Sequence, residues 1–164
     1  MMKRLALLLV FALAATLSFA QKNERKAPQT ALFVEALGQS VTFSFNFDTR
    51  FTKSSEGIGG RIGVGGWKIG ENGALTVPVG LNYLIGGKGK YFEAGVGVTF
   101  TDTDLFSEYE EDGMHALGTL DFGFRLQPED GGFSFRAGIT PIFRGGTNSY
   151  FIPWWGGVSL GYAF

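Results

Sequence analysis

Apolar residues recur at every second position along most of the chain after residue 30. A period of two is typical of β-strands that present one apolar and one polar face. Eight segments of this kind follow one another, separated by turns rich in glycine and charge. They span residues 31–37, 41–51, 58–67, 75–83, 92–100, 115–126, 133–144 and 152–164, of which the first is the least regular.

Two features indicate that the apolar faces contact lipid. The polar faces are rich in glycine, serine and threonine, which suits the narrow lumen of a small barrel. Aromatic residues gather at the strand ends, as in the girdles of membrane barrels; these are Phe51, Tyr83, Phe92, Phe133, Tyr162 and Phe164 at one rim, and Trp67, Phe100, Phe143 and Trp154 at the other. A soluble sandwich or lipocalin-like barrel is the alternative. The pattern favours an all-β protein, an eight-stranded antiparallel up-and-down transmembrane β-barrel with a filled polar lumen.

The last segment alternates as one row that ends in an aromatic at the final residue, and this row comprises Ile152, Trp154, Gly156, Val158, Leu160, Tyr162 and Phe164. It resembles the C-terminal strand of bacterial outer-membrane barrels. That resemblance implies recognition by the barrel-assembly machinery during biogenesis.

The N-terminal residues have the form of a secretory signal peptide. Lys3 and Arg4 precede an apolar run over residues 5–17, and Ala20 ends a small-residue cleavage site. A membrane anchor is the alternative, but the run is shorter than the roughly 20 residues of a span. We expect a signal peptide over 1–20, a short polar tail over 21–30 and a barrel over 31–164, in the outer membrane of a Gram-negative cell.

Composition narrows the possible functions. The 164-residue chain has a net charge of −1 and no cysteine. These values give no indication of nucleic-acid binding or of a polybasic membrane patch, and they exclude disulfides and cysteine-based chemistry. We expect no cofactor and no metal site.

Most of the chain after the signal peptide resembles small, uncharacterised outer-membrane barrels of the Bacteroidota. The segments that carry this resemblance are VPVGLNYLIGGKGKYFEAGVGVTF, GFRLQPEDGGFSFRAGITPIF and IPWWGGVSLGYAF. In architecture the chain is similar to outer-membrane protein X and to the barrel domain of outer-membrane protein A. The resemblance implies a fold rather than an activity.

The polar faces carry charges that would meet in the lumen, namely Asp48, Arg50, Arg61, Glu93, Asp121, Arg125, Arg136 and Arg144. A charge in a narrow lumen is costly unless it is paired. We expect a structural network that fills the barrel, with Glu93 and Asp121 bridged by Arg61, Arg125 and Arg136. The excess of arginine favours the alternative of a narrow, anion-preferring pore.

Two further features lie toward the predicted outer rim. His115, the one histidine, could act with Ser107 and with Glu108 or Asp112 in a lipid A-modifying enzyme, but a lone rim histidine indicates a solvated side chain, and we expect no catalytic residue. The longest connection is an acidic extracellular loop that contains Asp102, Asp104, Glu108, Glu110, Glu111 and Asp112. It could bind Ca²⁺ or bridge to lipopolysaccharide, but its spacing does not match an EF-hand and favours a solvated loop.

The sequence favours a structural, adhesive or surface-interaction role without enzymatic activity. The partners would be outer-membrane lipid and lipopolysaccharide, and we expect a monomer. A porin-like passage for a small or apolar solute is the alternative, since Pro78 and Pro141 remove donors from the strand ladder and could mark a lateral opening.

A first test follows from the alternation and the signal peptide. We expect the mature chain to fractionate with the outer membrane and to migrate faster on SDS gels unheated than boiled, because a closed barrel resists SDS at room temperature. Recovery of the chain as a soluble periplasmic protein would contradict the assignment of the faces.

Overall fold

The computed structural model describes residues 30–69, 72–102, 114–145 and 149–164. Its strands are β1 (Thr30–Leu37), β2 (Phe43–Arg50), β3 (Gly57–Ile69), β4 (Asn72–Gly87), β5 (Lys90–Asp102), β6 (Met114–Leu126), β7 (Gly132–Ile139), β8 (Ile142–Arg144), β9 (Tyr150–Ile152) and β10 (Gly156–Ala163), with a short 3-10 helix η1 (Gly38–Ser40) between β1 and β2. The described part of the chain contains no helix long and apolar enough to cross a membrane. The predicted signal peptide and most of the predicted tail lie outside the described residues.

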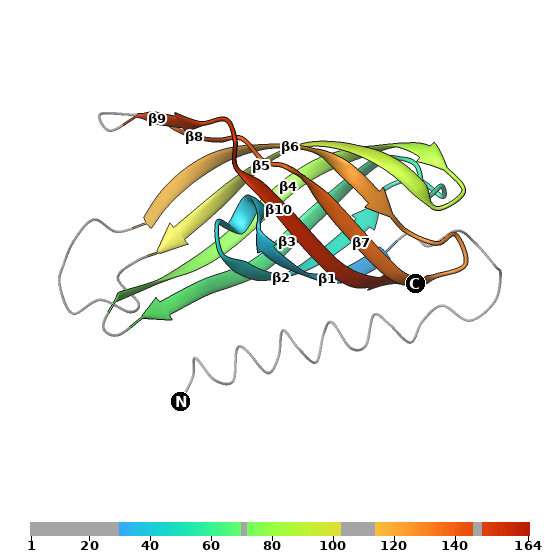
Figure 1. Ribbon diagram of the computed structural model, residues 1–164, viewed down its shortest axis with the longest axis horizontal. Helices are drawn as coiled ribbons and strands as arrows, with labels where there is room; N and C mark the ends of the chain where they lie inside the picture. Colours follow the sequence, from blue (N-terminus) through green and yellow to red (C-terminus); the bar gives the residue numbers. More distant parts are fainter. Residues whose placement is uncertain (1–29, 70–71, 103–113, 146–148) are drawn as a thin grey trace.

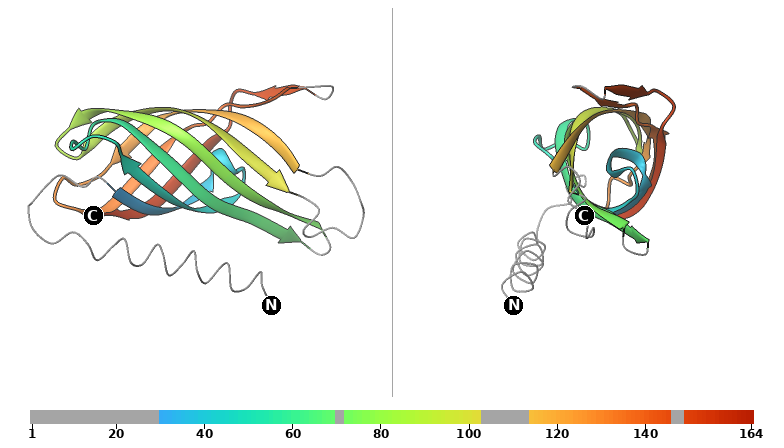
Figure 2. Two further views of the ribbon diagram at one scale, coloured as in Figure 1. Left: turned by 180° about the vertical axis from the view of Figure 1, so that it is seen from behind. Right: turned by 90° about the vertical axis from the view of Figure 1, so that its left-hand side faces the viewer.

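The strands form a closed antiparallel barrel (Figures 1 and 2). Each strand from β2 to β6 pairs with the next strand along the chain, and β1 closes the ring by pairing with β10. β7 and β8 share one register against β6, since Phe122 pairs with Ile139 and Thr119 with Ile142. They therefore form one interrupted seventh strand, and β9 with β10 forms the eighth. The predicted eight-stranded barrel is confirmed.

A β-bulge changes the predicted pattern of the last segment. Ile139 pairs with Gly156, whereas Ile142 pairs with Ile152, so the eighth strand advances four residues while the seventh advances three. The extra residue is a bulge at Pro153 and Trp154. Residues that pair directly share a face, so Ile152 lies on the face of the buried Ile142. The predicted single row is therefore broken by the bulge between Ile152 and Gly156, although Ile152 is 40% exposed, and it holds from Gly156 to Phe164.

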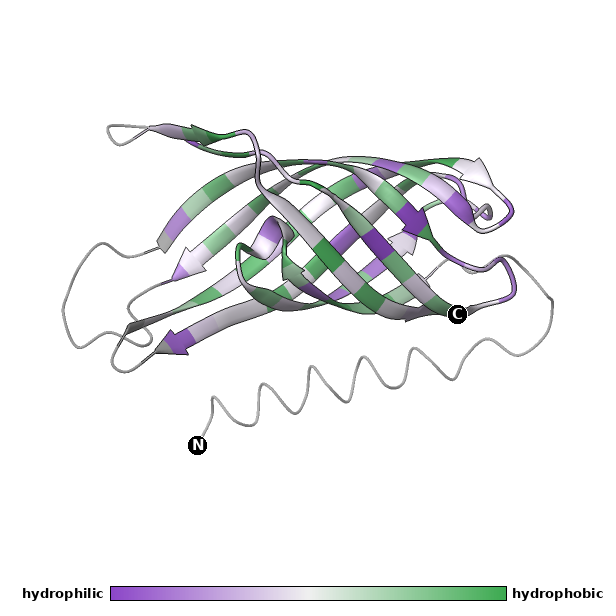
Figure 3. Cartoon of the chain, in the orientation of Figure 1, coloured by the Kyte–Doolittle hydropathy of each residue, from purple (hydrophilic) through white to green (hydrophobic). Residues whose placement is uncertain are grey.

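The outward face is apolar, and the polar side chains of the strands are buried in the lumen. Figure 3 shows hydrophobic and hydrophilic residues alternating along the strands. Phe45 is 69% exposed and Val96 is 52% exposed, whereas Asn46 and Glu93 are buried. The ten aromatic residues predicted for the two girdles are all exposed. Since the exposed apolar surface extends over every long strand, the fold is suited to a lipid environment.

The two ends of the barrel differ. One end, which we name the terminal end, holds the short connections 51–56, 88–89 and 127–131 and both ends of the barrel sequence, where Thr30 accepts a hydrogen bond from the backbone of Phe164 at 2.9 Å. At the opposite or distal end, β3 to β6 extend beyond β1 and β2, and the β8–β9 hairpin leaves the wall (Figure 1).

The face assignment predicts the effect of a charge on the outer wall. Val96→Arg places a cation on the lipid-facing side of β5, and we expect it to lower the free energy of unfolding in lipid vesicles by about 2–4 kcal/mol. Leu120→Arg on β6 is expected to act in the same direction. Ser54→Arg in an exposed turn is the control and should have little effect. Two neutral substitutions in the wall would mean that the faces are inverted.

Candidate functional site in the barrel lumen

The lumen is filled by charged side chains that the two-residue period of the strands turns inward. β2 provides Asp48 and Arg50, and the neighbouring strands provide further partners at matching heights. Asp48 pairs in register with Arg61 of β3, and Arg125 of β6 pairs with Arg136 of β7. All of these side chains are buried. Their burial makes mutual neutralisation necessary, because a lumen this narrow holds little water.

Arg125 is the centre of this network. Its side chain is 0% exposed, and its Nε and Nη2 atoms donate to Glu93 at 2.9 and 2.6 Å. The same guanidinium donates from Nη1 and Nη2 to the two carboxylate oxygens of Asp48, both at 3.1 Å. Asp48 also accepts from Arg50 at 2.9 Å and from Asn82 at 2.5 Å. One arginine thus connects β2, β5 and β6 across the lumen through charge-assisted hydrogen bonds.

A second pair involves Glu35, which the sequence analysis missed. Arg61 donates to both oxygens of Glu35, at 2.7 and 3.3 Å, and also to Asn46 at 3.0 Å. β1 in fact alternates, with Leu32 and Val34 exposed and Glu35 buried. This alternation, read from residue 32, could have identified Glu35.

Glu35 changes the charge balance of the lumen. The inner network of the described residues contains four acids and four arginines, namely Glu35, Asp48, Glu93, Asp121, Arg50, Arg61, Arg125 and Arg136. Arg144 lies apart from it. The expected excess of arginine, which favoured an anion-preferring pore, is therefore absent from this network.

The expected core of Glu93 and Asp121, bridged by Arg61, Arg125 and Arg136, forms around Glu93 but not around Asp121. Asp121 accepts hydrogen bonds from the Gln39 side chain and from Thr140 Oγ1, the latter at 3.1 Å. Arg125 lies four residues further along β6, a rise of about 13 Å, and meets Asp48 instead. The stagger between strands thus brings Arg125 to Asp48 of β2 rather than to Asp121 of its own strand.

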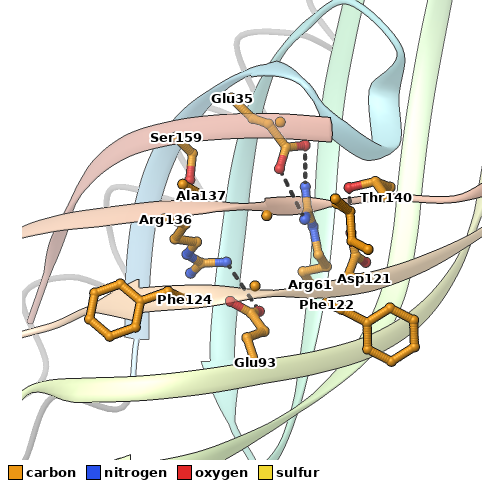
Figure 4. A pocket seen from close by; sticks show the side chains of 14 residues that line it. Glu35, Arg61, Glu93, Asp121, Phe122, Phe124, Arg136, Ala137, Thr140 and Ser159 are labelled. Carbon is orange, nitrogen blue, oxygen red and sulfur yellow. Dashed lines mark hydrogen bonds and ion pairs between the residues drawn. The ribbon is translucent and has the colours of Figure 1, made fainter. Parts of the chain in front are cut away.

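Arg136 has a different environment from the other arginines. Its guanidinium carbon lies 3.8 Å from the centre of the Phe33 ring, and its Nη1 lies 3.6 Å from Asp48 and 3.7 Å from Glu93. None of its side-chain nitrogens has a hydrogen-bond partner among the described residues. Arg136 borders a cavity of about 40 Å³ whose polar lining also includes Glu35, Arg61, Glu93, Asp121, Thr140 and Ser159 (Figure 4). Its apolar lining includes Phe122, Phe124 and Ile139, which are exposed on the outer wall.

The connection between β1 and β2 folds into the lumen, which the sequence analysis did not predict. Gln39 and Ser40 are buried, and Figure 2 shows η1 inside the ring of strands. Thr99 donates to the backbone oxygen of Gln39 at 2.7 Å, and the Trp155 indole donates to that of Gly38 at 3.1 Å. This segment covers the charged network on its distal side.

Buried side chains also close the lumen toward the terminal end. Leu84, Tyr91 and Gln127 are buried there, and Tyr91 pairs in register with Arg125. Together with the network and η1, these side chains fill the lumen except for the small cavity beside Arg136.

His115 and Arg144 meet toward the distal end. Arg144 Nη2 lies 3.0 Å from His115 Nδ1, and since arginine has only donors, the histidine nitrogen accepts. Ser107, Glu108 and Asp112, the other members of the considered catalytic set, lie outside the described residues. Of the acidic loop, only Asp102 is described. Within the described ranges, no three histidine, aspartate or glutamate side chains form a group that could hold a metal ion.

Comparison with known proteins supports the fold. No protein-family model and no curated protein matches the chain. Among solved structures, the N-terminal β-barrel domain of Pseudomonas aeruginosa OprF is similar, with a TM-score of 0.55 and 10% sequence identity. The match covers 85% of this chain and 98% of the OprF domain. At this identity the likeness shows the fold alone, that of a β-barrel domain.

The geometry predicts unequal roles for two arginines. Arg125→Met should lower the free energy of unfolding by about 3–5 kcal/mol, because it leaves the buried carboxylate of Glu93 without its hydrogen-bonded partner. Arg136→Met is the matched comparison and should cost less, since Arg136 makes no hydrogen bond to a described residue. Urea titrations in lipid vesicles measure both values. Equal losses, or a neutral Arg125→Met, would contradict the central role of Arg125.

Proposed function

We propose that this protein is a non-conducting outer-membrane barrel whose role is structural or is exerted through its distal end, and that it has no enzymatic activity. The observation that carries this proposal is the bridge from Arg125 to Asp48 and Glu93. It connects opposite parts of the wall at a level where all three side chains are buried. A solute could pass only if these ion pairs separated.

The location and orientation belong to the same proposal. The likeness to an OprF barrel domain and the apolar outer wall support an outer-membrane location, and the resemblance to small Bacteroidota barrels agrees with it. Both ends of the barrel sequence would face the periplasm, so the distal end, with its longer strands and the acidic loop, would face the exterior. That end would contact lipopolysaccharide or a surface partner, and the protein would act as a monomer.

A lateral passage for an apolar solute is the second candidate. The wall is continuous at Pro78, which pairs with Thr99 in the β4–β5 ladder. At Pro141 the ladder to β6 also continues, since the Pro141 carbonyl accepts from the Leu120 amide at 3.0 Å. Beyond it, β9 pairs with β8 but has no described partner on its other edge. An unpaired edge is unfavourable in lipid, so this part of the wall is where a lateral opening would lie.

Conductance recording in planar bilayers tests the closed lumen. We expect no stepwise conductance from the wild-type protein. Replacing both partners of one ion pair, Glu93→Ser with Arg125→Ser, keeps the charge balance while removing side-chain volume, and should produce small conductance steps. The heat-dependent gel shift verifies that the double variant is folded. Steady conductance from the wild type would refute the proposal.

A further inference from the structure

The segment that folds into the lumen, residues 38–42, has features of a movable cover, and we name it the lid loop. It is bounded by two residues with left-handed backbone conformations, Leu37 at φ +64° and Val41 at φ +69°. Neither is glycine, and for the β-branched Val41 such a conformation is strained. The folded-in position of the loop must therefore be maintained by its contacts.

Few polar contacts maintain it. The Gln39 side chain reaches Asp121, while Thr99 and Trp155 each donate to one carbonyl of the loop. The loop also packs closely on glycines, since a Cβ added at Gly157 would lie 2.6 Å from the Gly38 Cα. These contacts define a seat that fits the loop in one position.

Other polar groups at the same seat oppose closure. The hydroxyls of Ser40 and Thr42 in the loop, and of Thr76, Thr101 and Thr119 on the surrounding strands, are buried without a hydrogen-bond partner among the described residues. A buried hydroxyl without a partner is destabilising, and water would satisfy it if the loop moved outward. Backbone strain and unsatisfied hydroxyls therefore destabilise the closed position of the loop, whereas three side-chain hydrogen bonds stabilise it. Because these contributions oppose one another, the loop can open.

The lid loop adjoins the cavity beside Arg136. None of residues 38–42 lines the cavity, but Gln39 bonds to Asp121 and Gly38 packs on Gly157, and both of these partners line it. On one side of the cavity, the side-chain nitrogens of Arg136 and the hydroxyl of Ser159 have no hydrogen-bond partner among the described residues. On the other side, Asp121 accepts hydrogen bonds from Gln39 and Thr140 and takes no part in the Arg125 bridge. Glu35 and Glu93 are each bound by an arginine through two hydrogen bonds. A guest would thus meet a guanidinium whose hydrogen-bond donors are unused, although it lies within ion-pair distance of Asp48 and Glu93. If Gln39 withdrew, the guest would also meet a carboxylate bonded only by Thr140.

We propose that residues 38–42 are a lid that opens toward the distal side and admits small polar solutes to the chamber bordered by Arg136, Ser159 and Asp121. The solute class that fits is small and dipolar, with an acceptor group for Arg136 and a donor group for Asp121. Glu93, which the Arg125 bridge binds, lines the chamber, so a solute could enter without separating that bridge. Admission therefore does not require conduction, and this inference goes beyond the proposed function.

Cysteine accessibility tests the lid, since the chain has no cysteine of its own. Ser159→Cys places a thiol in the chamber, and the rate of its modification by 2-sulfonatoethyl methanethiosulfonate is measured on the full chain in lipid vesicles. We expect slow modification in the otherwise wild-type protein. Adding Gln39→Ala, which removes the bond to Asp121, should increase the rate at least tenfold. Thr99→Val, which removes a different lid contact, should act in the same direction.

Ser134→Cys is the matched control. Ser134 is buried and faces inward on β7, but it does not border the chamber. Its modification should remain slow in both lid variants. The proposal is overturned if neither lid variant accelerates modification at residue 159, or if residue 134 accelerates equally, which would indicate general loosening. It is also overturned if Ser40→Cys in the otherwise wild-type protein reacts as fast as Ser54→Cys in an exposed turn.

Discussion

The guanidinium of Arg125 occupies the centre of a lumen in which bulk water cannot neutralise a charge. An eight-stranded barrel has an interior about as wide as the side chains that fill it. Each inward charge must therefore find an opposite charge or a hydrogen-bond partner on another strand. Arg125 meets this requirement for Asp48 and Glu93 at once, and Arg50, Asn82 and Arg136 are arranged around those two carboxylates.

The same constraint explains why the barrel is both closed and filled. In lipid, every backbone donor and acceptor of the wall needs a partner, which the ring from β1 to β10 provides. Ring closure with eight strands leaves a narrow interior, and the inward face then has to be packed. The charged pairs fill its middle, Leu84 and Tyr91 fill the terminal side, and η1 fills the distal side. The wall is closed by strand pairing and the lumen by side-chain packing. An opening between two strands would therefore not by itself open a path along the lumen.

The distal half of the barrel is less regular than the terminal half. The bulge at Pro153 and Trp154 directs β8 and β9 away from the wall, and Trp154 is 86% exposed there. Short β1 and β2 strands leave their connection free to turn inward rather than extend the wall. Both irregularities lie at the end of the barrel that we propose faces the exterior.

The sequence alone determined the strands and their faces, because the two-residue period is a local property that survives any arrangement of the strands. It placed Asp48, Glu93 and Arg125 in the lumen for the same reason. It could not determine which charges meet, because partners are set by the stagger between strands, and this stagger exchanged Asp121 for Asp48. The role of Glu35 and the balance of four acids with four arginines became visible only with β1 in register. The inward fold of residues 38–42 leaves no periodic pattern in the sequence. The conformation of this short loop depends on contacts with Gly157, Thr99 and Asp121, which come from distant parts of the chain.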